Sequence, residues 1–314
     1  MSCSCNVTLS NTGTSGCSTA MAVTKKLILM SAINAGGNDA FASIAFIKSF
    51  SAVEPWLNVG TAPLSRWLPL PSSNDLENIV TVREEPVMQT FNSGKMAKVR
   101  NGFRSFEGFI PNGDTQLLER LVAFGCASIG AFLIDQDDNV IGSKRSQTTI
   151  PYTNLYPILI DKDTWDVQFV AATDSEVQMI KIKFQWASTE QDENLRMVPN
   201  SEMDWGRDEI YGLIDVYGTE ISCGQTSTVV DIFATNGTTE TEPITGLLVA
   251  NFAAYNVTGS ASVTVTGATE SVTVPGRYTL TYASQTVSDE LQFSIAKDRY
   301  DSGVGLEKLV FTVV

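Results

Sequence analysis

Three groups of side chains in this sequence are of types that could do chemistry, and the first is a cluster of acids. Asp135, Asp137 and Asp138 lie within four residues of one another. Carboxylates at alternate positions can wrap a calcium ion, as they do in an EF-hand loop. Val140 stands where that loop needs a glycine, and Ser146 stands where it needs a bidentate glutamate. A solvated turn between two strands explains the same acids, and we favour the turn over a cation site.

The second group is a basic cluster, which consists of Lys95, Lys98, Arg100 and Arg104. If residues 95–110 form one strand, Lys98, Arg100 and Arg104 project from one face and Lys95 projects from the other. Three interpretations stay open: a nucleic-acid patch, salt bridges to an acidic neighbour, and an ordinary solvated strand face. Four basic residues in an acidic chain are weak evidence for nucleic-acid binding, so we favour the interpretation of an ordinary solvated strand face.

The third group is the five cysteines, at positions 3, 5, 17, 126 and 223. Their number is odd and their spacing is irregular, which does not indicate a disulfide framework. A metal site in the first seventeen residues would need a fourth soft ligand that no nearby residue supplies. We therefore expect free thiols, with Cys126 as a small buried apolar residue.

The sequence contains no histidine, and this excludes many mechanisms. Serine and cysteine relays with an imidazole base and histidine-ligated zinc or iron are ruled out. The remaining acid groups, Glu84-Glu85 and Asp161/Asp163/Asp166, lie at expected strand ends, where turns use acids routinely. The sequence has no phosphate-binding glycine loop and no nucleophile elbow. We expect a protein that is not an enzyme and that holds no cofactor.

The formal net charge of −14 is divided unevenly along the 314 residues. Residues 1–188 carry 15 basic and 17 acidic side chains, a net charge of −2, whereas residues 189–314 carry 6 and 18, a net charge of −12. This asymmetry indicates two units with different surroundings. An acidic chain is a poor clamp for nucleic-acid phosphates, and no apolar stretch approaches the length of a membrane span.

The elements that must position these groups begin after an arm. Residues 1–23 are rich in Ser, Thr, Gly and Asn and predict a flexible segment that orders only against a partner. The apolar run from Thr24 predicts a buried strand. Asn38-Asp39 could cap a short helix that carries Phe41, Ile44 and Ile47 at helical spacing.

Residues 49–75 form a long stretch with four prolines and two tryptophans, Trp56 and Trp67. Loops of this length are uncommon in compact domains unless they are functional. The loop either lies over its own core or packs on a neighbouring subunit, and tryptophan can anchor both kinds of surface.

Further elements follow from periodicity. We expect strands at residues 76–92 and 95–110, a helix that is capped by Asp114 and ends at Gly125, and a hairpin at residues 129–142. Two more strands follow, WDVQFVAA and EVQMIKIKFQW, and in the second the apolar phase shifts between Met179 and Ile180, as a β-bulge would require. The acidic residues 189–209 interrupt the strand pattern and predict a linker.

Residues 210–314 alternate with period two and have turn signals about every ten residues, which is typical of an Ig-like β-sandwich. SVTVTG at 262–267 and SVTVPG at 271–276 look like the two arms of one hairpin. Three triads mark the inner faces of strands: Tyr278/Leu280/Tyr282, Leu291/Phe293/Ile295 and Leu309/Phe311/Val313. The expected fold is therefore mainly β, with an N-terminal β domain at residues 24–188 that has one or two short helices, and a C-terminal sandwich.

The order of these elements resembles a known class of proteins. The passage NGFRSFEGFIPNGDTQLLERLVAFGCASIGAFLIDQDDNVIG resembles the strand–helix–hairpin part of phage tail-tube-like subunits. The chain as a whole is similar to tail ring proteins of crAss-like phages that end in an Ig-like domain. This resemblance rests on the order of the elements along the chain.

The resemblance implies a non-enzymatic subunit of the virion tail that is assembled in the host cytoplasm. Its partners would be copies of itself in a ring and neighbouring tail or portal-proximal proteins, with genome DNA only as passing cargo and no membrane. Trp56, Trp67, Lys95, Lys98, Arg100 and Arg104 are the candidate interface residues. A surface adhesin or carbohydrate-binding module is the alternative, and a carboxylate hydrolase without histidine is a third.

Deleting residues 1–23 should leave the thermal stability nearly unchanged and impair assembly, because the segment has almost no core residues. Thermal melting and particle size measure the two effects. A truncated protein that fails to fold, or that assembles normally, would contradict the prediction.

Overall fold

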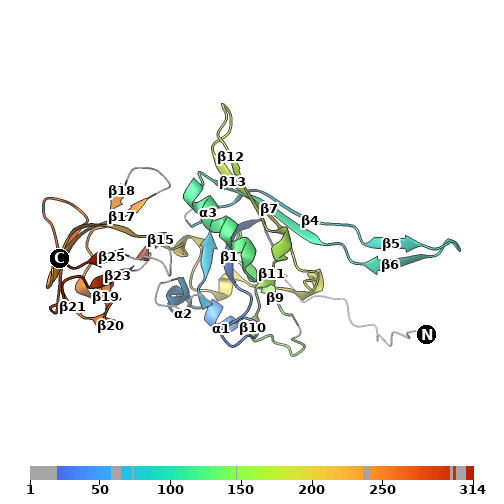
Figure 1. The fold of residues 1–314 in the computed structure, drawn as a ribbon. Coiled ribbons are helices and arrows are strands. Elements are labelled where there is room, and N and C mark those ends of the chain that lie inside the picture. Colours follow the sequence, from blue (N-terminus) through green and yellow to red (C-terminus); the bar gives the residue numbers. More distant parts are fainter. Residues whose placement is uncertain are drawn as a thin grey trace.

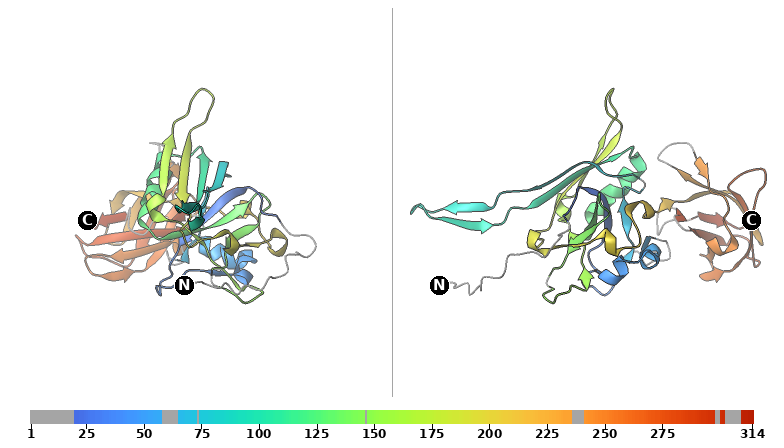
Figure 2. Two further views of the ribbon diagram at one scale, coloured as in Figure 1. Left: turned by 90° about the vertical axis from the view of Figure 1, so that its right-hand side faces the viewer. Right: turned by 180° about the vertical axis from the view of Figure 1, so that it is seen from behind.

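A computed structural model describes residues 20–57, 65–72, 74–145, 147–235, 241–297, 300–301 and 309–314 (Figure 1). The fold is mainly β, with 47% of residues in strands and 15% in short helices, as the sequence predicted. Two bodies lie side by side, and a long hairpin projects from the larger one on the side away from the smaller one (Figures 1 and 2).

The larger body is built on a sheet that is buried on both faces. Its strand order is β14-β9-β8-β1-β3, with β11 paired to β8. The strands are β1 (Thr24–Ser31), β3 (Leu68–Leu70), β8 (Ile129–Asp135), β9 (Val140–Ser143), β11 (Ile158–Leu159) and β14 (Leu195–Val198). Leu27 and Leu29 point into one core, which we call the first core, while Ile28 and Met30 point into the other, the second core. Burial on both faces explains why β1 is a continuous apolar run rather than an alternating one.

A second sheet covers the first core, in the order β12-β13-β7-β4. Its strands are β4 (Glu77–Arg83), β7 (Arg104–Pro111), β12 (Asp166–Val170) and β13 (Met179–Gln185). Phe106 and Phe184 lie fully buried on its inner face. Helix α3 (Thr115–Ala123), continued by η3 (Phe124–Cys126), follows β7 and is capped by Asp114, whose Oδ1 accepts a hydrogen bond from Leu117 N at 2.7 Å. The predicted cap is confirmed.

Short helices cover the second core. These are α1 (Ile44–Ile47), α2 (Phe50–Val53) and η1 (Glu54–Leu57), and β2 (Ala42–Ser43) pairs with β10 (Asn154–Leu155) beside them. The helix cap predicted at Asn38-Asp39 is wrong. Ser43 caps α1, because its Oγ accepts from Phe46 N at 3.1 Å, and Phe41 precedes the helix with an exposed side chain.

The smaller body consists of two sheets around one apolar core. One sheet has the order β15-β24-β23-β19-β20 with β25 paired to β23, and the other has the order β16-β17-β22-β21 with β18 paired to β17. The strands are β15 (Ile214–Asp215), β16 (Tyr217–Cys223), β17 (Ser227–Thr235), β18 (Thr241–Pro243), β19 (Phe252–Asn256), β20 (Ala261–Val263), β21 (Val265–Glu270), β22 (Arg277–Tyr282), β23 (Glu290–Lys297), β24 (Tyr300–Asp301) and β25 (Leu309–Thr312). All three predicted inner-face triads are buried in the shared core.

The predicted linker at 189–209 is wrong, because this segment belongs to the larger body. It contains η5 (Asp192–Asn194), β14, η6 (Asn200–Glu202) and η7 (Arg207–Glu209). Strand β14 adds to the first sheet beside β9, and Trp205 is buried in the second core. Several of its charged residues form ion pairs with the rest of the body, as Asp192 does with Arg104 and Arg207 does with Asp75 and Asp138.

Three smaller expectations also need correction. The residues at 271–276 form the turn between β21 and β22, so the repeated SVTV motif does not mark two arms of one hairpin. The pairing of β13 with β7 and β12 is continuous through Met179 and Ile180, so the structure has no bulge there. Cys126 is exposed, because it ends η3 at the surface; like the buried Cys223, it is a free thiol.

Raising the pH above 10 should destabilise the smaller body. Burial raises the pKa of Tyr278 to about 12 from an ordinary value of 10.0, and burial also raises that of Tyr282. The folded state therefore keeps protons that the unfolded chain loses between pH 10 and about 12, so stability is complete below pH 10 and is lost through that window.

Denaturant unfolding at several pH values measures this slope, which each tyrosine can steepen by at most about 1.4 kcal/mol per pH unit. Tyr278→Phe should lower stability at neutral pH, since the hydroxyl bonds Ile244 O at 3.0 Å and Leu247 N at 3.1 Å, and it should flatten the slope. An unchanged slope in this variant would contradict the assignment.

Candidate functional site

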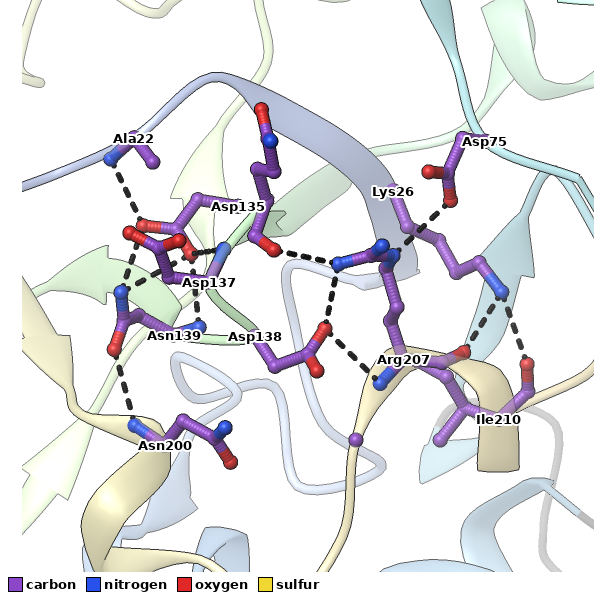
Figure 3. A network of polar contacts seen from close by, with 12 residues as sticks. Ala22, Lys26, Asp75, Asp135, Asp137, Asp138, Asn139, Asn200, Arg207 and Ile210 are labelled. Atoms are coloured by element: carbon purple, nitrogen blue, oxygen red, sulfur yellow. Dashed lines mark hydrogen bonds and ion pairs between the residues drawn. The ribbon is translucent and has the colours of Figure 1, made fainter.

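At the β8–β9 turn, Asp135 is buried in a polar network, whereas Asp137 is exposed and Asp138 is half-buried (Figure 3). Asp135 is 0% exposed, and its Oδ1 accepts from Asp137 N at 3.0 Å and from Asn139 N at 2.9 Å. Its Oδ2 accepts from Ala22 N at 3.0 Å and from Asn139 Nδ2 at 2.9 Å. The predicted turn is present, but the carboxylate at its base is enclosed.

These donors leave Asp135 little capacity for a cation. A carboxylate accepts at about four lone-pair sites, and the donors around Asp135 occupy them. Among the residues that the structure describes, no group of three acidic or thiol side chains could hold a metal ion. The network therefore supports the turn and not the calcium alternative.

Two cations extend the network to the chain that leaves the body. Arg207 Nη1 donates to Asp138 Oδ1 at 2.9 Å and to Gln136 O at 2.7 Å, and its Nε donates to Asp75 Oδ1 at 3.2 Å. Lys26 is only 2% exposed, and its Nζ donates to Arg207 O at 2.9 Å and to Ile210 O at 3.2 Å. Lys26 thereby ties β1 to the last residues before the smaller body.

Burial lowers the pKa of Lys26, and the nearby Asp75 and Asp208 act in the opposite direction. A buried ammonium is costly unless its protons are bonded, and here two carbonyl groups bind them. The sequence analysis did not single out Lys26, because a lysine at the start of an apolar run resembles a solvated strand end. Lys26 and the buried Ile28 are two residues apart and point to the same face of the strand, and this spacing could have indicated that Lys26 is buried.

The four basic residues of the second cluster do not share one face. Strand β7 begins at Arg104, whereas β6 (Met96–Arg100) belongs to a separate ribbon with β5 (Val87–Thr90), and Asn101–Phe103 separate the two. Lys98 pairs with Met88 and Arg100 pairs with Val87, so a register shift puts Lys98 and Arg100 on opposite faces. The expectation of one continuous strand with a shared basic face is therefore wrong.

Their partners also differ. Arg104 Nη2 lies 2.8 Å from Asp192, which also pairs with Arg83. Arg100 stacks over the Phe103 ring at 4.3 Å, and Lys98 Nζ donates to Asn101 Oδ1 at 2.7 Å. Arg104 thus fits the interpretation of a salt bridge to an acidic neighbour, and that neighbour is in the same chain.

Residues 84–100 form a hairpin that we call the hairpin arm. All of its residues are exposed, including those of β5 and β6 (Figures 1 and 2). Its large apolar side chains are Val87 (41% exposed), Met88 (45%), Phe91 (47%), Met96 (63%) and Val99 (60%). Val87 and Met88 are adjacent in β5 and point to opposite faces, so apolar groups lie on both faces of the ribbon.

The arm joins the body at a tight crossing. Glu84 N donates to Phe103 O at 2.8 Å, and a Cβ on Gly102 would lie 1.8 Å from Glu84 O, so only glycine fits there. Gln191 Oε1 accepts from Asn101 Nδ2 at 2.7 Å and from Arg83 Nη2 at 2.9 Å. These bonds hold the root of the arm to the segment after β13.

The two tryptophans lie on the protein's own core. Trp67 is 0% exposed and packs against Phe132 at 5.5 Å and Trp56 at 5.8 Å, measured between ring centroids. The prediction of one long loop at 49–75 is wrong, because the segment contains α2, η1 and β3. Trp67 packs on the protein's own core, so it is removed from the candidate interface residues. Trp56 is half-buried against Phe46 at 4.3 Å. Residues 58–64 and 73 of the loop lie outside the described part of the chain.

An open groove lies on the lower side of the larger body, between α1, β10 and β14. Its volume is about 300 Å³, and apolar side chains line most of it, including Ile44, Leu155 and Val198. Ile150, which is 77% exposed, forms one lip. The sequence analysis did not predict the groove, because its walls come from segments far apart in the chain.

Comparisons with protein-family models, with curated proteins and with solved structures found no match for this chain. None of the helices in the described residues is long and apolar enough to span a membrane. A proposal about function therefore rests on the geometry of the described residues.

Replacing Asp135 with alanine should destabilise the protein by about 3 kcal/mol, because several buried donors would lose their acceptor. Asp137→Ala is the matched control, since the Asp137 side chain is exposed and its loss should change stability by less than about 0.5 kcal/mol. Denaturant unfolding measures both variants, with and without millimolar calcium.

A calcium site would give a different pattern. Both substitutions would then be harmful, and calcium would raise the stability of the wild-type protein. That result would overturn the assignment of the turn as a hydrogen-bonded network.

Deletion of residues 1–23 also needs a revised boundary. Ala22 N bonds Asp135, and Gln136 N donates to Val23 O at 2.8 Å, so the last residues of the predicted arm are attached to the body. Residues 1–19 lie outside the described part of the chain. A deletion that ends at residue 19 keeps both bonds and is therefore the better test of the role that we predict for the N-terminal segment in assembly.

Proposed function

We propose that this chain is a non-enzymatic structural subunit of a phage tail that assembles with copies of itself into a ring around the genome channel. The observation that carries the proposal is the hairpin arm, which exposes five large apolar side chains in a ribbon that no part of the described chain covers. An isolated two-stranded hairpin is at best marginally stable in water. An arm of this kind is expected where a partner covers it.

The size of the arm fits such a partner. Nine residues on a strand span about 30 Å and two paired strands are about 10 Å wide, so the two faces of the ribbon offer about 600 Å². A standard interface buries about 800 Å² on each partner. The arm alone would supply most of one interface in a repeating assembly.

A second observation supports a subunit that lets DNA pass without binding it. The outer face of the β12-β13-β7-β4 sheet carries Lys181 and Lys183 beside Glu107 and Asp166, and Lys181 Nζ lies 2.8 Å from Glu107 Oε1. Tight binding to phosphates needs more cationic than anionic side chains on a surface, and the lysines of this face are matched by acidic side chains. In the proposed ring, this sheet would face the channel and the acidic smaller body would lie outside.

The remaining parts of the proposal follow the resemblance. The larger body would be the tail-tube-like domain, and the smaller body would be the Ig-like domain. Neighbouring tail or portal-proximal proteins would contact the ring in the virion, after assembly in the host cytoplasm. Trp56, Lys95, Lys98, Arg100 and Arg104 remain interface candidates in this proposal.

The double variant Met96→Asp/Val99→Asp should abolish self-assembly and leave thermal melting unchanged, because both side chains are more than half exposed. Covering the five apolar groups of the arm would contribute on the order of 5 kcal/mol, and two buried charges would remove this gain. Sedimentation velocity and negative-stain images measure the size and shape of the particles.

The control is Leu248→Asp/Val272→Asp, which places the same charges on exposed apolar positions of the smaller body. It should assemble like the wild-type protein. A wild-type protein that stays a monomer and binds glycans would contradict the proposal and favour the adhesin or carbohydrate-binding alternative.

A further inference from the structure

We infer that the groove beside Ile150 is the receptor for the hairpin arm of a second copy of this chain. The inference rests on the proposed function and deepens it, because it names the two surfaces that meet. The arm is an apolar projection, and the groove is an apolar recess elsewhere on the same molecule. A projection on one copy that fits a recess on the next makes a head-to-tail contact, which closes into a ring when the rotation between copies permits it.

The arm cannot fill the groove of its own chain. In Figure 1 and in the right-hand view of Figure 2 the arm extends away from the body, whereas the residues that line the groove belong to α1, β10 and β14 of that body and to the segments beside them. An arm that fills this groove must therefore come from another molecule. A second copy is the occupant that the structure itself supplies.

The sizes of the two surfaces agree. A recess of about 300 Å³ has room for one or two large side chains, and the tip of the arm presents Phe91 and Met96 on either side of its turn. Phe91 N donates to Lys95 O at 2.8 Å, which holds that turn closed. The remaining length of the ribbon would lie along the lip at Ile150 and Pro151, both of which are exposed.

The charges at the mouth of the groove do not oppose this contact. Lys48 Nζ pairs with Glu202, so these two rim charges compensate each other. Arg196 Nη2 donates to Tyr152 Oη at 3.2 Å, and its guanidinium lies 4.9 Å from the centre of the Tyr152 ring. The apolar floor is thus flanked by charged groups that already have partners.

A mixing experiment with full-length proteins tests the inference. The arm variant Met96→Asp/Val99→Asp keeps an intact groove, and the groove variant Ile150→Asp keeps an intact arm. We expect each variant alone to associate at least tenfold more weakly than the wild-type protein. An equimolar mixture should form a one-to-one complex and stop there, since only one functional junction is available.

Sedimentation velocity gives the mass of the mixture, and thermal melting shows that each variant is folded. Ile150→Lys serves as a second groove variant with the opposite charge and should behave like Ile150→Asp. Leu248→Asp/Val272→Asp, mixed with the arm variant, is the control and should still form complexes larger than a one-to-one pair.

Each other outcome overturns the inference. If the groove variants assemble like the wild-type protein, the arm binds elsewhere and the proposed function stands without this inference. If both variants are monomeric and their mixture stays monomeric, the contact is not head-to-tail. If the wild-type protein itself does not associate, the proposed function and the inference both fail.

Discussion

The buried ammonium of Lys26 is the interaction on which the arrangement of the whole molecule depends. Its charge is enclosed, and the carbonyl groups of Arg207 and Ile210 bind its protons. Because breaking such contacts leaves a buried charge without partners, the segment before the smaller body is held firmly against β1. Arg207 then extends the same network to Asp138, and Asp135 holds Ala22 at the entry to β1. One polar cluster thus sets where the chain enters the larger body and where it leaves.

The hairpin arm differs from this network, because it leaves apolar side chains exposed to solvent. In the body, Asp135 and Lys26 are buried and hydrogen-bonded, whereas the arm exposes apolar side chains on both faces of a narrow ribbon. A firmly held body with an exposed apolar ribbon is the pattern that we expect of a subunit whose ribbon is covered by a neighbouring copy. The root of the arm at Gly102 and Gln191 directs the ribbon away from the body. In the assembly that we propose, the apolar groove of the body receives the arm of the next copy.

Much of the fold could be predicted from the sequence, because its strands and cores have clear periodicity. The inner-face triads of β22, β23 and β25 and the Asp114 cap of α3 depend on local pattern, and both predictions are confirmed. The acidic segment at 189–209 could not be assigned correctly, since β14 is recognised only through its pairing with β9. The network of Lys26 and Arg207 joins residues 181 positions apart, and no local signal specifies that contact. The sequence also does not show that residues 84–100 project from the body, because an exposed strand and a buried strand can have the same composition.

Hydrogen exchange of the backbone amides of residues 86–100 tests the central claim most directly. In the monomeric protein these amides should exchange within seconds, since the ribbon is solvent-exposed and only two strands wide. In the assembled protein they should be protected by at least a hundredfold, while the amides of the turn at 271–276 should exchange equally fast in both states. Equal exchange of the arm in the monomer and in the assembly would contradict the account.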